Sequence, residues 1–132
     1  MNQELDNVLE RICDRDLRYK LDAYEFVLEA LSYTQKKFTR PKHVTGKELL
    51  EGIKDLLLNE YGPMTLFVLD YWGVKDTEDF GYIVFNLVHN KILSRTDEDR
   101  VDDFKGGYDF KDAFHAGYRR QLEKKISRMR SF

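Results

Sequence analysis

The chain has 132 residues, 42% of them hydrophobic, and its 22 lysine and arginine residues are outnumbered by 24 aspartate and glutamate residues. This length and apolar content suit one hydrophobic core and argue against a second independent domain. The formal net charge of −2 argues against a generic nucleic-acid or membrane binder, and no apolar run approaches the ~20 residues that span a bilayer. Because residues 1–16 are charged throughout, unlike a signal peptide, we expect a cytoplasmic protein that makes no membrane contact.

Helical periodicity begins near the N-terminus. Apolar residues spaced i, i+3, i+4 and i+7 predict a first helix with one buried stripe. These residues are Leu5, Val8, Leu9 and Ile12. Asp22 and Glu25 have the spacing of a capping box and predict a second helix that continues to about Phe38. The apolar surface of this second helix is broad, so we expect it at the centre of the fold.

The clearest local pattern is HVTGKELLEGIKDLLLNEYGP, residues 43–63. Thr45 is a natural N-cap, and Glu48 has the position from which its side chain reaches back to that cap. Gly62 predicts the end of this helix, because glycine readily adopts left-handed backbone angles.

Two further helices are predicted after Pro63. Proline is favoured at a first helical position, so MTLFVLDYW is predicted as a short buried helix that includes Trp72. A strand is the alternative for this stretch, because several of its residues are β-prone. The flanking Pro63 and Gly73 favour the helix. Either Asp76 or Thr77 is expected to cap the next helix, which extends to about Asn90.

After Asn90 the helical period is lost. Short apolar segments flank an acidic break, which predicts a small β-hairpin at residues 92–104. Three helices followed by a hairpin is the element order of a winged helix, so residues 45–104 are interpreted as a winged-helix-like unit. We therefore expect a mainly α, single compact domain with helices at 1–44, this unit at 45–104, and a corner with a C-terminal helix at 105–132.

The segment RVDDFKGGYDFKDAF, residues 100–114, is interpreted as that corner. Gly106 and Gly107 give the backbone freedom to turn, and Asp109 is the expected N-cap of the last helix. Asp112 would lie in its first turn, where a carboxylate interacts favourably with the positive helix end. A glycine-bearing ligand loop is the alternative, but two adjacent glycines match neither phosphate-binding pattern.

Catalytic and metal-binding motifs are not recognised in the sequence. Cys13 is the single cysteine, and its position within an apolar helical spacing favours packing over nucleophilic chemistry. Asp112 and His115 share a helix face, but a metal site usually needs further ligands, and His43 and His89 are distant in sequence. We predict no catalytic residue, metal, cofactor or small-molecule ligand.

Two concentrations of basic residues remain as candidates for phosphate or nucleic-acid binding. The first, in the loop at residues 36–43, contains Lys36, Lys37, Arg40, Lys42 and His43. The second, on the C-terminal helix at residues 119–130, contains Arg119, Arg120, Lys124, Lys125, Arg128 and Arg130. Against this interpretation, both clusters can be solvated surface, and the carboxylates of the expected hairpin would repel a DNA backbone.

The strings HVTGKELLEGI, TEDFGYIVFNLV and DDFKGGYDFKDAF, within residues 18–114, resemble an uncharacterised family of short bacterial proteins called the Minf family. The resemblance implies a bacterial protein with one compact domain, and it brings no assigned activity and no catalytic residue. The leading functional hypothesis is therefore a non-enzymatic interaction or regulatory module, which binds another protein or a second copy of this chain. Nucleic-acid binding through the two basic clusters is the alternative.

Overall fold

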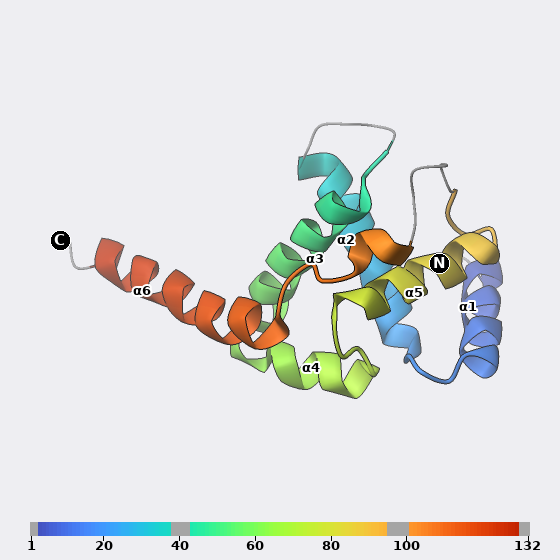
Figure 1. Ribbon diagram of the computed structural model, residues 1–132, viewed down its shortest axis with the longest axis horizontal. Helices are drawn as coiled ribbons and strands as arrows, with labels where there is room; N and C mark the ends of the chain where they lie inside the picture. The colour runs from blue at the N-terminus through green and yellow to red at the C-terminus, as the bar shows by residue number, and fades with distance from the viewer. Residues whose placement is uncertain (1–2, 38–42, 95–100, 130–132) are drawn as a thin grey trace.

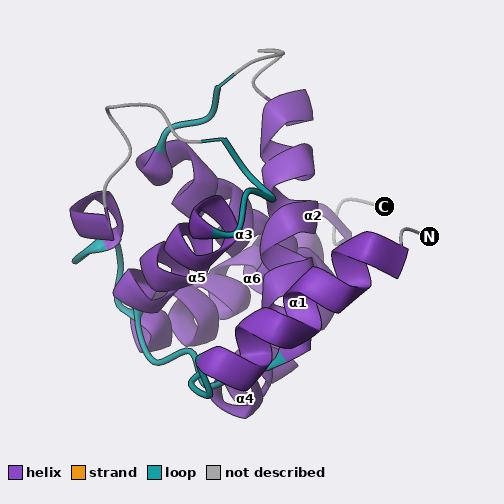
Figure 2. Cartoon of the chain, turned by 90° about the vertical axis from the view of Figure 1, so that its right-hand side faces the viewer, coloured by secondary structure: helices purple, strands orange, loops and turns teal. Residues whose placement is uncertain are grey.

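The computed structural model describes residues 3–37, 43–94 and 101–129, and within these ranges the regular structure is helical (Figures 1 and 2). The α-helices are α1 (Gln3–Arg15), α2 (Leu21–Lys37), α3 (Gly46–Tyr61), α4 (Thr65–Trp72), α5 (Thr77–His89) and α6 (Gly117–Met129). Two short 3₁₀ segments, η1 (Gly62–Met64) and η2 (Val101–Phe104), and one π-helical segment, η3 (Lys111–Ala116), complete the elements. The predicted mainly helical fold is confirmed, and residues 65–72 form a helix rather than a strand.

Helix α2 lies at the centre of the fold, as its broad apolar surface predicts. It packs against α1, α3, α4 and α5, and its buried residues occupy more than one face of the helix. These residues are Ala23, Tyr24, Phe26, Val27, Ala30 and Thr34. The helix begins at Leu21, so Asp22 lies inside the first turn and not at the cap. A carboxylate in the first turn still interacts favourably with the positive end of the helix.

The start of α3 has both hydrogen bonds of a capping box. The backbone N–H of Glu48 donates to Thr45 Oγ1 at 3.1 Å, and the backbone N–H of Thr45 donates to Glu48 Oε1 at 3.0 Å. These bonds satisfy two of the N–H groups that a helix start leaves without an intrahelical partner.

Replacing Thr45 with alanine should lower the free energy of unfolding by about 1 kcal/mol, the typical cost of removing a side-chain N-cap. Denaturant melts of the two proteins measure this difference. Thr45→Ser retains the acceptor oxygen and should melt close to the wild type. An alanine variant with an unchanged midpoint would show that the cap does not stabilise the fold.

At α5, the structure distinguishes the two expected capping residues. Asp76 is the N-cap: its side chain accepts from the N–H of Asp79, whose carboxylate accepts in return from the N–H of Asp76. Thr77 is buried, and its hydroxyl donates to the carbonyl of Phe104 at 2.5 Å and accepts from the N–H of Gly107 at 3.0 Å. Thr77 therefore joins α5 to the segment that follows η2.

The β-hairpin predicted at residues 92–104 is wrong for the residues that the structure describes; residues 95–100 lie outside them. Val101–Phe104 is a 3₁₀ turn, and Phe104 is buried against α3 and α5. Added Cβ atoms at Gly46 and Gly81 would lie within 3.1 Å of the Phe104 side chain, so both glycines leave space for this ring. Burial of Phe104 between two helices therefore selects a helical turn over an extended strand, and the winged-helix-like interpretation loses its hairpin.

The Gly-Gly stretch forms the predicted corner. Gly106 has a φ of 64°, which favours glycine, and a Cβ at Gly107 would lie 2.7 Å from Leu50 Cδ1. The Tyr108 hydroxyl donates to the carbonyl of Leu50 at 2.7 Å and holds the corner on α3. Asp109 Oδ1 then accepts from the N–H of Asp112 at 3.0 Å, at the start of the C-terminal helical segment.

Candidate interaction surfaces

The basic loop predicted at residues 36–43 is not a uniform cationic surface in the described part of the chain. Lys36 and Lys37 are exposed in the last turn of α2, and the Lys37 ammonium forms an ion pair with Asp55 of α3. His43 is half-buried and lines a pocket between helices, whereas Arg40 and Lys42 lie outside the described residues.

That pocket lies between α2, α3 and α5 and has a volume of about 300 Å³. Its lining is mainly apolar and consists of Leu31, Gln35, His43, Val44, Gly46, Leu49, Val84, Val88, Ile92, Leu93, Ser94 and Phe104. His43 is the one titratable side chain of this lining. Because general acid–base catalysis requires a positioned acid or base with suitable partners, this lining by itself does not define an active site.

The second predicted basic cluster lies on α6, which projects from the helical body (Figure 1). All described side chains from residue 119 to 129 are exposed, and the main contacts of α6 are with η3. The cations on this helix are Arg119, Arg120, Lys124, Lys125 and Arg128. The end of α2 lies elsewhere on the molecule, so among the described residues Lys36 and Lys37 are not brought together with the cations of α6 (Figure 1).

Helix α6 also carries an exposed apolar stripe, formed by Leu122, Ile126 and Met129, whose exposed fractions are 43%, 42% and 66%. Their i, i+4, i+7 spacing places them on one face of the helix. Arg119 precedes Leu122 by three residues, and Lys125 follows Leu122 by three, so cations border the stripe on both sides. An amphipathic helix of this kind is typical of elements that bury one face against a partner.

Another surface feature is a groove of about 450 Å³ between α2 and α4, which we call the α2–α4 groove. Its lining consists of Asp22, Glu25, Phe26, Glu29, Tyr61, Phe67, Val68, Tyr71 and Trp72. Phe67 and Tyr71 are 69% and 59% exposed, although both are large aromatic side chains. The sequence predicts a short buried helix at residues 64–72, but α4 lies at the surface and buries Leu69 and Trp72 while it exposes Phe67 and Tyr71, so the sequence gives no sign of this groove.

The α2 side of this groove is acidic. Asp22, Glu25 and Glu29 are exposed and recur at i, i+3 and i+7, which places them on one face of α2. Partial burial raises the pKa of Glu60, and the nearby Glu29 carboxyl group raises it further. The aromatic groove is therefore bordered by the carboxylates of α2, and Glu60 of α3 lies next to one of them, Glu29.

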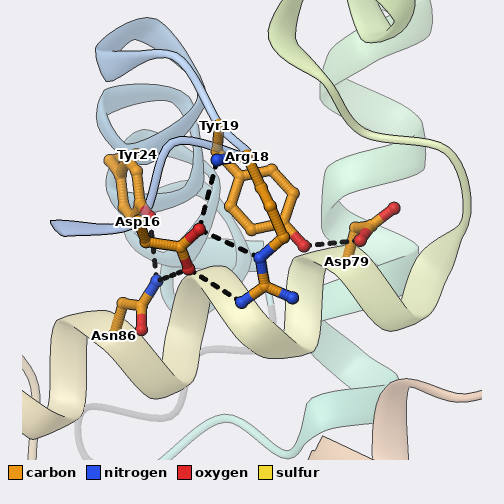
Figure 3. Close-up of polar contacts among 6 residues, drawn as sticks. All are labelled: Asp16, Arg18, Tyr19, Tyr24, Asp79 and Asn86. Atoms are coloured by element: carbon orange, nitrogen blue, oxygen red, sulfur yellow. Dashed lines mark hydrogen bonds and ion pairs between the residues drawn. The ribbon is translucent and has the colours of Figure 1, made fainter. Parts of the chain in front are cut away.

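A partly buried network of polar side chains joins the α1–α2 connection to α5 (Figure 3). Asp16 accepts hydrogen bonds from the backbone and guanidinium of Arg18, at 2.7–3.1 Å, and from the Asn86 amide at 3.0 Å. The same amide donates to the Tyr24 hydroxyl at 2.9 Å, and the Tyr19 hydroxyl donates to Asp79 at 2.5 Å. The hydrogen bonds from Arg18 and Asn86 hold the pKa of Asp16 well below its usual range, and burial raises the pKa of Tyr24 to about 12.

The Asp16 network has an expected dependence on pH. Because the pKa of Asp16 is lowered by folding, its contribution to stability is present above about pH 4, the ordinary aspartate pKa, and is lost as pH falls further. Asp16→Asn should therefore lower the free energy of unfolding by about 1–2 kcal/mol at pH 7, a modest value because the Arg18 side chain is half-exposed. The difference between the two proteins should shrink as pH falls from 5 to 2.

Urea melts across this pH range measure the effect. Asp14→Asn is the matched control, because Asp14 is an exposed carboxylate of the same helix end. If the two variants lose equal stability at pH 7, the loss reflects net charge and not the Asp16 network.

Metal and thiol chemistry find little support in the described residues. Within residues 3–37, 43–94 and 101–129, no group of three or more histidine, cysteine or acidic side chains could hold a metal ion. Cys13 is half-buried, and burial together with neighbouring carboxylates raises the pKa of its thiol, which disfavours the nucleophilic thiolate. No helix in the same ranges combines the length and apolar character needed to cross a membrane.

Comparison with known proteins leaves the family open: no family model, curated protein or solved structure matches this chain, and the resemblance to the Minf family stays a prediction.

Proposed function

We propose that this protein is a non-enzymatic protein-interaction module whose binding element is α6. The observation that carries the proposal is the exposed stripe of Leu122, Ile126 and Met129 on a helix that projects from the body (Figure 1). Burial of such a stripe in a partner's groove would be favourable by about 25 cal/mol per Å² of apolar surface removed from water. The cations beside the stripe would select a partner with an acidic border.

The thermodynamics of isolated helices support a role in binding. Helix α6 continues directly from η3, whose Ala113 and Phe114 are buried, and all described side chains from residue 119 to 129 are exposed. These exposed turns gain little stability from tertiary packing, and helix formation in water is marginal without it. A partner that covers the stripe would supply the packing that the helical body does not. This is the helix-in-groove mode of recognition, in which apolar residues at i, i+4 and i+7 act as anchors.

Deletion of residues 123–132 should leave the thermal melting temperature within a few degrees of the wild type, because the described part of this segment is exposed. The same deletion should abolish any protein complex that the intact chain forms. Scanning calorimetry measures the first effect, and photo-crosslinking from a probe at Gln121, followed by mass spectrometry of the captured chain, measures the second. Unfolding of the truncated protein would instead show that α6 is needed for the fold and that its charged side chains are only its solvated face.

A matched variant separates protein binding from nucleic-acid binding. Leu122→Ser/Ile126→Ser/Met129→Ser leaves every charge of α6 in place, so it should lose a protein partner and retain a nucleic acid. Nucleic-acid binding through Arg119, Arg120, Lys124, Lys125 and Arg128 is the second candidate, because these cations are exposed on one helix. It would fall steeply between 50 and 200 mM salt, as counterion release requires. Crosslinks to nucleic acid alone would overturn the proposal.

A further inference from the structure

We infer that the partner of α6 is a second copy of this chain, and that the α6 stripe of one copy lies in the α2–α4 groove of the other. This inference rests on the proposed function and names its partner. It depends on three properties of the two surfaces, namely their polarity, their charge and their spacing.

The polarity of the two surfaces matches. The groove exposes the aromatic side chains of Phe67 and Tyr71, and its floor includes Trp72, whose ring centroid lies 5.1 Å from that of Phe26 and 5.9 Å from that of Tyr61. The α6 stripe offers two aliphatic side chains and one methionine. Methionine makes favourable contacts with aromatic rings, and contact between the surfaces would remove exposed apolar area from both.

The charges of the two surfaces are opposite. Asp22, Glu25 and Glu29 line the groove along α2. Cations border the α6 stripe, and Glu123 is the single acidic residue among residues 117–129. Arg119 and Lys125 placed near Asp22, Glu25 and Glu29 would form favourable charge pairs with them. A neutral apolar helix would form no such pairs.

The spacings are also compatible. Arg119 and Lys125 are six residues apart, about 9 Å along a helix, and Asp22 and Glu29 on α2 are seven residues apart, about 10.5 Å. Helix α6 points away from the helical body (Figure 1), and its stripe is exposed, so a second molecule can reach it. The groove and α6 are different surfaces, so the contact is heterologous, and reciprocal exchange between two copies would close it into a dimer.

Charge reversal on each surface tests the inference in the full-length chain. The groove variant is Glu25→Lys/Glu29→Lys, and the α6 variant is Arg119→Glu/Lys125→Glu. All four residues are exposed, so both variants should fold, which circular dichroism checks. Sedimentation velocity over a range of protein concentrations should show self-association of the wild type at low salt. Each variant alone should associate at least tenfold more weakly.

Mixing the two variants is the decisive measurement. In an equal mixture, the basic α6 of the groove variant meets the acidic groove of the α6 variant, and the reversed pair is complementary as well. Association should therefore recover in the mixture and in the variant that carries all four changes. Trp72, the single tryptophan, lines the groove, so its emission should change on association of the wild type.

Other results would overturn the inference in distinguishable ways. Association that is lost in the α6 variant but retained in the groove variant, with unchanged Trp72 emission, would show that two α6 helices pair with each other. A wild type that stays monomeric, while α6 crosslinks to a different protein, would overturn self-recognition and leave the proposed function standing. A monomer whose α6 crosslinks to no protein would overturn both.

Discussion

Replacing Trp72 with alanine should lower the free energy of unfolding by about 3–5 kcal/mol, the range measured for deleting a large buried aromatic side chain. Trp72 is 3% exposed and ends α4 just before Gly73. Its ring packs on Phe26 and Tyr61, and it thus ties α4 to both α2 and α3. The alanine variant would lose these contacts and leave a cavity at the junction of three helices.

Denaturant melts measure the loss, and the intrinsic fluorescence of this single tryptophan gives an independent check. Native emission should lie well to the blue of free tryptophan in water and should shift to the red on unfolding. Trp72→Phe keeps part of the aromatic packing and should cost clearly less than alanine. Emission near that of free tryptophan, with a small alanine effect, would contradict the burial on which this prediction depends.

Gly52→Ala should lower the free energy of unfolding by about 2–3 kcal/mol, as overpacking of a well-packed core does. This direction is opposite to the ordinary effect, because alanine in a helix interior is favoured over glycine by about 1 kcal/mol. An added Cβ at Gly52 would lie 1.8 Å from Thr34 Oγ1. Thr34 is fully buried, and its hydroxyl donates to the carbonyl of Ala30 at 2.7 Å, so it cannot move at low cost.

A double-mutant cycle identifies this clash as the cause. Thr34→Ala removes Oγ1 and Cγ2, and the nearest remaining Thr34 atom, Cβ, would lie 3.0 Å from the new Cβ. The variant that carries both changes should therefore be more stable than the sum of the two single losses predicts. Chemical denaturation of all four proteins gives the coupling free energy. Additive losses, or a Gly52→Ala protein that is more stable than the wild type, would contradict the close approach of α2 and α3.

The starts of α3, α5 and the C-terminal helical segment could be predicted from the sequence, because their determinants are local, whereas the cap expected at Asp22 is not the start of α2. Thr45 with Glu48 and Asp109 with Asp112 form capping bonds across three residues, and such bonds depend on little beyond the order of the chain. The central position of α2 and the burial of Trp72 also follow from local composition. A helix that is apolar on more than one face must be surrounded by other elements.

The 3₁₀ turn at residues 101–104, in place of the predicted strand, depends on tertiary packing. Short β-prone segments around a polar break are compatible with a hairpin, but Phe104 is buried where Gly46 and Gly81 leave space for its ring. These two glycines are 58 and 23 residues distant from Phe104, so local periodicity contains no signal of the fit.

Of the candidate surfaces, too, some features follow from the sequence and others depend on tertiary packing. The amphipathic character of α6 is local and was visible in the sequence, but its projection from the body depends on which elements contact it. The α2–α4 groove and the hydrogen bond between Asp16 and Asn86, 70 residues apart, exist only because helices distant in sequence pack together. Tertiary structure alone decides these features, since side-chain periodicity determines which face of a helix is apolar but not which partner covers it.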